Sequence, residues 1–189
     1  MLKLMDCTLR DGANVVGKGF NAELTIMMLE GLTMSGVDYI EMGNAGGIGA
    51  YEIAGFTKAE TDEKYLELAN PYLQKSQIGM FLNAKRYSEK YVKLAAERGL
   101  SFLRVGVDAD ECNLAIEPIK AIKANGMKAF FAAMKAYLLE PDAIAETAKM
   151  LEDIGLDEFT IMDSAGCMLP EDVAKMMEAI VKKSKIPVA

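Results

Sequence analysis

A short pattern that recurs four times limits what this chain can fold into: a helical stretch, then a glycine, then a short apolar run. The runs lie at 39–43, 102–106, 129–132 and 159–163, and the glycines before them are Gly36, Gly99, Gly126 and Gly155. Glycine at the end of a helix permits the positive φ with which the chain turns toward a strand. Runs that are apolar on both faces are typical of parallel strands covered by helices. The pattern therefore predicts an α/β fold made of successive strand–helix units.

The stretches around these runs have the apolar spacing of amphipathic helices. We expect helices over 22–34, 88–98, 111–124, 141–153 and 170–183, with further strands over 2–5 and 78–82. Asn21 is suited to cap the first helix, and Pro141 and Pro170 stand where first-turn prolines belong. The segment 45–61 is expected to be a loop that shapes a pocket.

The number of units indicates a closed architecture that is incomplete. Six strand–helix units fit in the 189 residues, and a seventh strand begins at 185–188. A (β/α)8 TIM barrel needs about 250 residues, so we expect one partial barrel domain over 1–189 that is truncated at its C-terminal end. An open doubly wound sheet is the alternative, but no G-x-G-x-x-G follows the first strand, which disfavours a dinucleotide-binding domain.

Charge and composition exclude several classes of partner. The chain has 21 Lys and Arg against 28 Asp and Glu, a net charge of −7, and no basic run, which argues against nucleic acid. No apolar stretch approaches the roughly 18 residues of a membrane span, and Asp6 precedes any signal-peptide core. Three widely separated cysteines fit a reducing compartment, so we expect a cytoplasmic protein. Because the chain has no histidine, triads and histidine-ligated metal sites are excluded within these residues.

Polar side chains gather where the predicted strands end, which is where chemistry lies in parallel α/β folds. These ends carry Asp6–Gly12, Glu41–Asn44, Asn83, Arg104, Asp108, Lys135 and Asp163–Gly166. Convergent carboxylates there suggest a divalent cation or an acid–base pair. Each also has a structural interpretation, in which Asp108 caps a helix, Glu41 pairs with Arg104, and Lys135 is a solvated charge. The glycines at 43, 46, 47 and 49 fit a flexible active-site loop better than a phosphate cradle.

The first strand end is the most specific of these signals. Asp6-Cys7-Thr8-Leu9-Arg10-Asp11-Gly12 resembles the D-x-T-L-R-D-G signature of the pyruvate carboxyltransferase-like, HMG-CoA lyase-like metal-dependent TIM barrels. The segment 40–43 resembles the family's I-E-x-G, and 163–166 resembles its D-S-x-G. The resemblance covers the whole chain and is greatest to the 4-hydroxy-2-oxovalerate aldolase branch.

This resemblance implies a divalent-metal-dependent carbon–carbon lyase or aldolase that acts on a 2-oxo acid through a pyruvate enolate. It implies that Asp11 binds Mn²⁺ or Mg²⁺ and that Arg10 stabilises the enolate oxygen. Asn14 and Glu41 are further catalytic candidates. Substrate-binding roles are implied for Arg10, Lys135, Asn44 and Ser164. The resemblance also suggests a homo-oligomer, with an aldehyde dehydrogenase as a candidate partner.

Two departures from the family keep other functions open. Asn14 stands where the aldolase branch has a proton-transferring histidine, and the family's His-x-His metal ligands at strand 7 have no counterpart in the chain. Asparagine cannot act as a general base near neutral pH. The alternatives are a Claisen condensation with an acyl-CoA, as in isopropylmalate and homocitrate synthases, a Schiff-base mechanism at Lys135, and a non-catalytic truncated fragment. We expect an intact parent enzyme, and no activity from the 189 residues alone.

Overall fold

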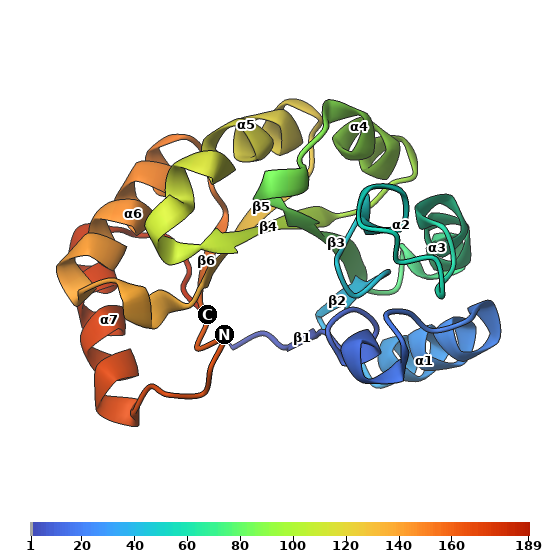
Figure 1. Ribbon diagram of the computed structural model, residues 1–189, viewed down its shortest axis with the longest axis horizontal. Helices are drawn as coiled ribbons and strands as arrows, with labels where there is room; N and C mark the ends of the chain where they lie inside the picture. Colours follow the sequence, from blue (N-terminus) through green and yellow to red (C-terminus); the bar gives the residue numbers. More distant parts are fainter. Residues whose placement is uncertain (1) are drawn as a thin grey trace.

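The strands form one curled parallel sheet with the helices on its outer side (Figure 1). The computed structural model describes residues 2–189. The six strands follow the order β1-β2-β3-β4-β5-β6, and each neighbouring pair is parallel. Strand order that equals chain order is the order of a TIM barrel. The curled sheet therefore confirms the predicted incomplete barrel.

The elements alternate as the sequence predicts. The strands are β1 (Met5–Asp6), β2 (Tyr39–Met42), β3 (Gln77–Asn83), β4 (Phe102–Asp108), β5 (Lys128–Met134) and β6 (Glu158–Ile161). The helices are α1 (Ala22–Met34), α2 (Ala50–Ile53), α3 (Asp62–Ala69), α4 (Glu89–Glu97), α5 (Ile116–Ala124), α6 (Pro141–Asp153) and α7 (Pro170–Lys183). Short 3₁₀ turns separate them: η1 (Gly12–Val16), η2 (Asn70–Tyr72), η3 (Ala84–Arg86), η4 (Ala109–Ala115) and η5 (Ala136–Leu138).

The predicted start and stop signals act as expected. Gly36, Gly99, Gly126 and Gly155 have φ values of 73°, 79°, 78° and 98°, which a side chain would strain. The Oδ1 atom of Asn21 accepts a hydrogen bond of 2.9 Å from the Leu24 N–H and so caps α1. These glycines and this cap define where the chain leaves and enters helices.

Three boundaries differ from the predictions. Strand β1 lies at Met5–Asp6 rather than 2–5, and the Leu4 N–H just before it bonds the Asp38 side chain. The expected helix over 111–124 begins as the 3₁₀ turn η4 and becomes α-helical only at Ile116. The expected loop 45–61 contains the single helical turn α2.

The segment predicted to begin a seventh strand pairs with β6 through a single parallel bridge and is not a full strand. Val188 forms a parallel bridge with Phe159, and the Phe159 N–H donates to the Pro187 carbonyl at 3.0 Å. The Ala189 N–H returns a bond of 2.9 Å to the Phe159 carbonyl. In Figure 1 the two chain ends lie near each other at the open side of the arch.

The two faces of the sheet are packed differently. On the convex face, a large apolar cluster that includes Val105 and Phe131 joins the strands to the helices. On the concave face, Tyr39, Phe102 and Phe130 form a separate aromatic cluster, with ring centroids 4.8–5.8 Å apart. Because strand side chains alternate between faces, Glu41 and Arg104 lie on the concave face, two residues beyond Tyr39 and Phe102 along their strands. The aromatic cluster thus forms a floor below the charged rim.

Candidate active site

The centre of the rim is Glu41, whose carboxylate is completely buried and holds two arginines. Oε1 accepts from Arg10 Nε at 2.5 Å and from Arg104 Nη2 at 2.7 Å. Oε2 accepts from Arg104 Nε at 2.6 Å. Arg104 therefore binds both carboxylate oxygens, a geometry that fixes a guanidinium strongly. One carboxylate from β2 thus orients two cations, one from the β1 turn and one from β4.

Arg10 is held on three sides. Besides the bond to Glu41, its Nη1 donates to Asp11 Oδ1 at 2.7 Å, and its Cζ lies 4.7 Å from the centroid of the Phe81 ring. Stacking on an aromatic face is favourable for a guanidinium. Glycine at 106 is required for this arrangement, because a Cβ there would lie 2.2 Å from the Phe81 ring. A glycine on β4 thereby positions the aromatic ring under Arg10.

The pair interactions determine the charge states at this centre. Burial alone would raise the pKa of Glu41, but the guanidinium groups of Arg104 and Arg10 outweigh it, so the pKa is lowered and the carboxylate stays ionised. Although burial opposes it, the charge of Glu41 raises the pKa of Arg104. Burial and the Glu41 charge raise the pKa of the neighbouring Cys7 thiol to about 11. Cys7, 3.4 Å from Arg104 Nη2, is therefore a neutral thiol and not a nucleophile near neutral pH.

The other residues predicted near the first strand lie beside this centre. The Asp11 side chain is 64% exposed, so its second oxygen is accessible. Asn14 is exposed in the turn η1, where its amide donates to the Asp11 carbonyl at 3.0 Å. Its Oδ1 accepts from Lys18 Nζ at 2.9 Å. The fold thus brings Arg10, Asp11, Asn14 and Glu41 together at one end of the sheet.

Lys135 and Ser164 lie on the opposite flank of the rim. Lys135 Nζ donates to Asp108 Oδ2 at 2.7 Å, and its backbone N–H donates to Ser164 Oγ at 2.9 Å. Lys135 has a left-handed backbone with φ of 53°, which is uncommon outside glycine. Hydrogen bonding to Asp108 raises the pKa of Lys135. A Schiff-base lysine needs the opposite shift, so the geometry disfavours that alternative. Asp108 makes this ion pair and provides no side-chain cap to η4.

Two residues at strand ends, Asn44 and Asp163, form hydrogen bonds with loop backbone groups at the rim. Asn44 is fully buried, and its amide donates to the Phe56 carbonyl at 3.0 Å, so it ties down the segment 45–56. Asp163 accepts from the N–H groups of Met168 and Cys167, at 2.8 and 3.0 Å, and these bonds lower its pKa. Asn44, directly after the I-E-x-G segment, and Asp163 of the D-S-x-G segment therefore shape the rim as well as lining it.

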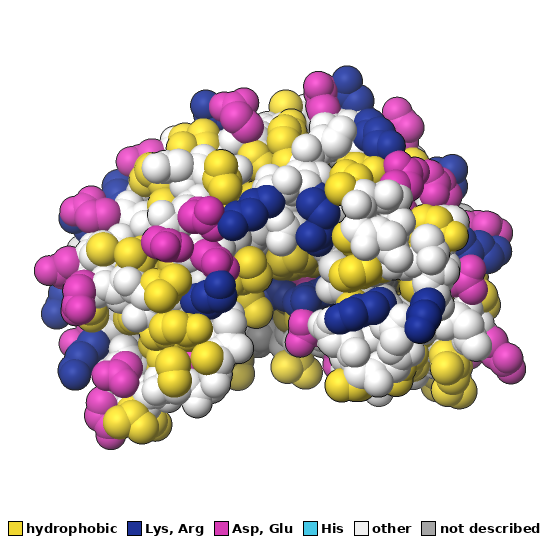
Figure 2. All heavy atoms as spheres, in the orientation of Figure 1, with side chains coloured by type: hydrophobic (Ala, Val, Ile, Leu, Met, Phe, Trp, Pro, Cys, Tyr) yellow, Lys and Arg dark blue, Asp and Glu magenta, His cyan; other side chains and the backbone are white. Residues whose placement is uncertain are grey.

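Figure 2 shows basic and acidic side chains meeting around the hollow of the arch. Asp108, Asp110 and Glu111 are the only group of three potential metal-ligating side chains with close ligand atoms among residues 2–189. Two ammonium groups already compensate them, since Lys135 pairs with Asp108 and Lys85 lies 2.5 Å from Glu111. A cation would have to displace these lysines. Asp11, with one accessible carboxylate oxygen, fits a single ligand of a hard cation that takes its remaining ligands from water or substrate.

Arg104 belongs to the centre although the predicted site residues did not include it. The sequence does carry a signal for it, because Arg104 lies within a predicted strand and an ion pair with Glu41 is one structural interpretation of these two charges. Phe81 gave no such signal, since an aromatic residue in a strand ordinarily indicates core. Its contact with Arg10 depends on the register of β3 against β4, which pairs Phe81 with Arg104.

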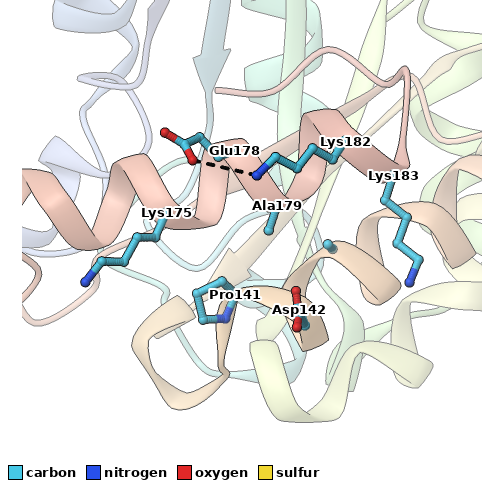
Figure 3. Close-up of a pocket in the computed structure, with 8 residues that line it drawn as sticks. Pro141, Asp142, Lys175, Glu178, Ala179, Lys182 and Lys183 are labelled. Carbon is cyan, nitrogen blue, oxygen red and sulfur yellow. Dashed lines mark ion pairs between the residues drawn. The ribbon is translucent and has the colours of Figure 1, made fainter.

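A second hollow lies on the outer layer, between α6 and α7 (Figure 3). Pro141, Asp142 and Lys175 are among its lining residues, and Lys182 Nζ lies 3.9 Å from Glu178 there. These charges belong to helices on the convex side of the sheet. The hollow is therefore separate from the rim at the ends of the strands. None of the described helices is long and apolar enough to cross a membrane.

Comparisons with known proteins agree with this geometry. The HMGL-like family matches residues 1–189. A 4-hydroxy-2-oxovalerate aldolase of Moorella thermoacetica is 33% identical over 187 residues, which are 99% of this chain and 55% of the relative. An oxaloacetate decarboxylase of Mycobacterium tuberculosis is 29% identical and covers 98% of the chain and 54% of the relative. The chain therefore spans about half the length of these relatives. The carboxyl transferase domain of Rhizobium etli pyruvate carboxylase superposes with a TM-score of 0.80 at 16% identity, over 99% of this chain and 34% of that one, and shares the fold.

Proposed function

Because the chain belongs to the HMGL-like family, we propose that the protein is a divalent-metal-dependent carbon–carbon lyase or aldolase that acts on a 2-oxo acid. The reaction would make or break a bond next to the carbonyl through the enolate of pyruvate, as in a 4-hydroxy-2-oxovalerate aldolase. The observation that carries the proposal is the orientation of Arg10 by Glu41, Asp11 and Phe81 at the end of β1.

Arg10 is suited to stabilise the developing oxyanion. An enolate concentrates negative charge on one oxygen, and donors that are oriented before reaction stabilise it without reorganising. Arg10 is 6% exposed, and its guanidinium is already fixed by the Glu41 and Asp11 carboxylates. Glu41 acts as a positioning residue here, because its oxygens are fully occupied by the two arginines.

Asp11 is the residue that would hold a divalent cation, with Mn²⁺ or Mg²⁺ as the candidates. When bound, the cation supplies positive charge close to the enolate oxygen. A single carboxylate holds such a cation weakly. Water, substrate oxygens and ligands beyond this rim would therefore complete the coordination.

The remaining predicted residues have roles that the geometry supports to different degrees. The protonated Lys135, oriented by Asp108 and by the Ser164 hydroxyl, is suited to bind the substrate carboxylate. Asn14 is exposed beside Asp11 and suited to donate a hydrogen bond. Asn44 would act indirectly by holding the loop over the rim. A homo-oligomer, an aldehyde dehydrogenase partner and a cytoplasmic location stay predictions.

Oxaloacetate decarboxylation is a second candidate, since one of the relatives carries that name. Loss of carbon dioxide from oxaloacetate also produces the pyruvate enolate, so the same Arg10 centre would serve it. A Claisen condensation with acetyl-CoA differs, because it releases a free thiol. Incubation with oxaloacetate, with 4-hydroxy-2-oxovalerate, and with acetyl-CoA plus a 2-oxo acid separates the three reactions by their products.

The proposal is tested with the intact parent protein, because no activity is expected from the 189 residues alone. The measurement is exchange of the pyruvate methyl protons with deuterium in the presence of Mn²⁺. Arg10→Lys and Asp11→Asn are each expected to slow exchange by about 10²–10³-fold, the usual effect of removing one oxyanion-stabilising group. Lys64→Met, at an exposed ion pair on α3, is the control and should exchange at the wild-type rate. No exchange by the wild-type parent protein with either Mn²⁺ or Mg²⁺, or exchange unaffected by both variants, contradicts the proposal.

A further inference from the structure

Two cations at the β1–β3 side of the rim have no acidic partner. Most rim cations are paired, as Arg10 and Arg104 are with Glu41, and Lys135 is with Asp108. Among residues 2–189, no carboxylate oxygen lies within 4.0 Å of Lys18 or Arg86. Both cations instead contact the segment 43–56, which contains the glycines after β2.

Arg86 is half-buried in η3, directly after β3, and is poorly satisfied. Its Nη2 donates to the Gly46 carbonyl at 2.5 Å, while its Nε is buried without any acceptor. Burial lowers the pKa of Arg86, and no neighbouring charge opposes this effect. A desolvated guanidinium without a counter-charge is unfavourable. Its position therefore has little rationale as a stabilising contact, whereas a bound oxyanion would offset the cost.

Lys18 approaches the same segment from the β1 side. Its backbone has a φ of 84°, directly after Gly17 at 92°, which is an uncommon conformation for lysine. Its carbonyl accepts from the Ala45 N–H at 2.9 Å. Its Nζ donates to Asn14 Oδ1 at 2.9 Å and lies 5.5 Å from the Phe56 ring centroid. The ammonium is thus held at the rim by neutral groups alone.

Gly46 and Phe56 connect the two cations. A Cβ at position 46 would lie 2.8 Å from the Phe56 ring and 3.1 Å from Arg86 Nη2, so the ring lies beside Arg86 as well as beside Lys18. Gly47 packs on the carbonyl of Phe81, where a Cβ would lie 2.2 Å from the oxygen. The Phe81 ring also stacks on Arg10. The segment 43–56 therefore connects Lys18 and Arg86 with the proposed enolate centre.

We propose that Lys18 and Arg86 form a second anion site, which binds an oxyanion group, carboxylate or phosphate, on the carbonyl compound that reacts with the enolate. The role as a substrate site rests on the proposed function, whereas the binding of an oxyanion does not. Lys135 would hold the 2-oxo acid on the other flank of the rim. The second substrate would therefore carry negative charge, and uncharged aldehydes would bind less well.

The test is a titration of the metal-free protein, in EDTA, with inorganic phosphate and separately with acetate. We expect saturable binding, with shifts of the Gly46 and Gly47 amide signals in ¹H–¹⁵N spectra. Arg86→Gln should weaken binding at least tenfold, and Lys18→Gln severalfold. The tighter of the two probes identifies the preferred oxyanion. Arg98→Gln removes the same charge from an exposed arginine at the end of α4 and should bind like the wild type.

The outcomes separate this site from the enolate chemistry. If Arg86→Gln does not fold, the Lys18→Gln and Arg86→Lys variants are titrated in its place. Lys18 contacts only neutral groups, so its replacement should leave the fold intact. Absence of binding to both probes, or binding unchanged in the Lys18 and Arg86 variants, overturns the anion site. Binding that depends on both residues, in an intact parent protein that does not exchange pyruvate protons with metal, retains the anion site and rejects the proposed function.

Discussion

Two buried carboxylates flank the segment after β2, and their surroundings differ sharply. Glu41 is 0% exposed and Asp62 is 3% exposed. Glu41 accepts three hydrogen bonds from Arg10 and Arg104, whereas Asp62 accepts one, from the Gly49 N–H at 2.6 Å, and its Oδ1 has no donor. The pKa of Glu41 is lowered, and burial raises the pKa of Asp62 to about 6. Equal burial thus produces opposite charge preferences, because the partners decide.

The two groups make stability depend on pH in opposite directions. The lowered pKa of Glu41 stabilises the folded state above the ordinary glutamate value, and this contribution is lost as the pH falls. The raised pKa of Asp62 stabilises the folded state below its ordinary value of 3.8, and this contribution is lost as the pH rises through about 6. Neutralising each carboxylate with its amide is therefore a matched test.

Glu41→Gln is expected to have the largest effect. Removing the charge leaves the buried guanidinium of Arg104 without a counter-ion and leaves Arg10 with only the exposed Asp11 carboxylate. Breaking a buried pair in this way costs about 3–5 kcal/mol of unfolding free energy. Denaturant unfolding at pH 7.5 measures the loss. Glu67→Gln, at an exposed pair on α3, is the control and should unfold like the wild type. A cost for Glu41→Gln as small as that of the control would show that the arginines find other partners.

Gly106→Ala tests whether the Glu41 centre depends on the aromatic ring beneath Arg10. The new Cβ would lie 2.2 Å from Phe81, so the ring must move. Overpacking of this kind costs about 1–3 kcal/mol, and we expect slower pyruvate exchange in addition. Gly31→Ala in α1 has no atom within 4 Å of its Cβ and should stabilise the protein slightly. Full exchange activity in Gly106→Ala would separate Phe81 from the positioning of Arg10.

The Glu41 side of the comparison was largely predictable from the sequence. The I-E-x-G and R-D-G segments identified the residues, and the strand–glycine pattern placed them at the same end of a parallel sheet. The contact between Arg10 and Phe81 was not predictable, because it requires the register of β3 on β4 and the missing side chain of Gly106. Sequence patterns indicate which face a residue occupies, but the register decides which neighbours meet.

The burial of Asp62 could not be predicted from the local sequence. An aspartate in the first turn of a helix is ordinary, and Thr61 before it caps α3 by accepting from the Lys64 N–H. Nothing in the sequence indicates that the segment 45–61 folds back and buries this carboxylate against Gly49. The same fold-back buries Asn44, which the family resemblance implied as a substrate ligand. Tertiary contacts of this kind are hard to predict in long loops, because such loops can adopt many conformations.

Asp62→Asn is expected to stabilise the protein at neutral pH. The amide oxygen can still accept from Gly49, and no charge stays buried. The gain is about 1–2 kcal/mol at pH 7.5, which exceeds the 0.3–1 kcal/mol that an acidic first-turn residue gains from the helix dipole. The difference from the wild type should shrink toward zero at pH 4. Unfolding measured between pH 4 and pH 8 gives this profile, and an equal difference at all values would contradict the assigned charge state.

Lys135→Met extends the comparison to an exposed pair and should affect stability least. Lys135 and Asp108 are 46% and 23% exposed, so solvent screens their attraction. We expect an unfolding midpoint close to that of the wild type, but about tenfold weaker binding of oxalate, which mimics the pyruvate enolate, because one charged hydrogen bond is lost. Lys149→Met, at a comparably exposed pair on α6, should change neither quantity. Unchanged oxalate binding in Lys135→Met would exclude Lys135 from the substrate site. A large loss of stability would show that the exposed Lys135–Asp108 pair contributes to folding as strongly as the buried pairs of Glu41.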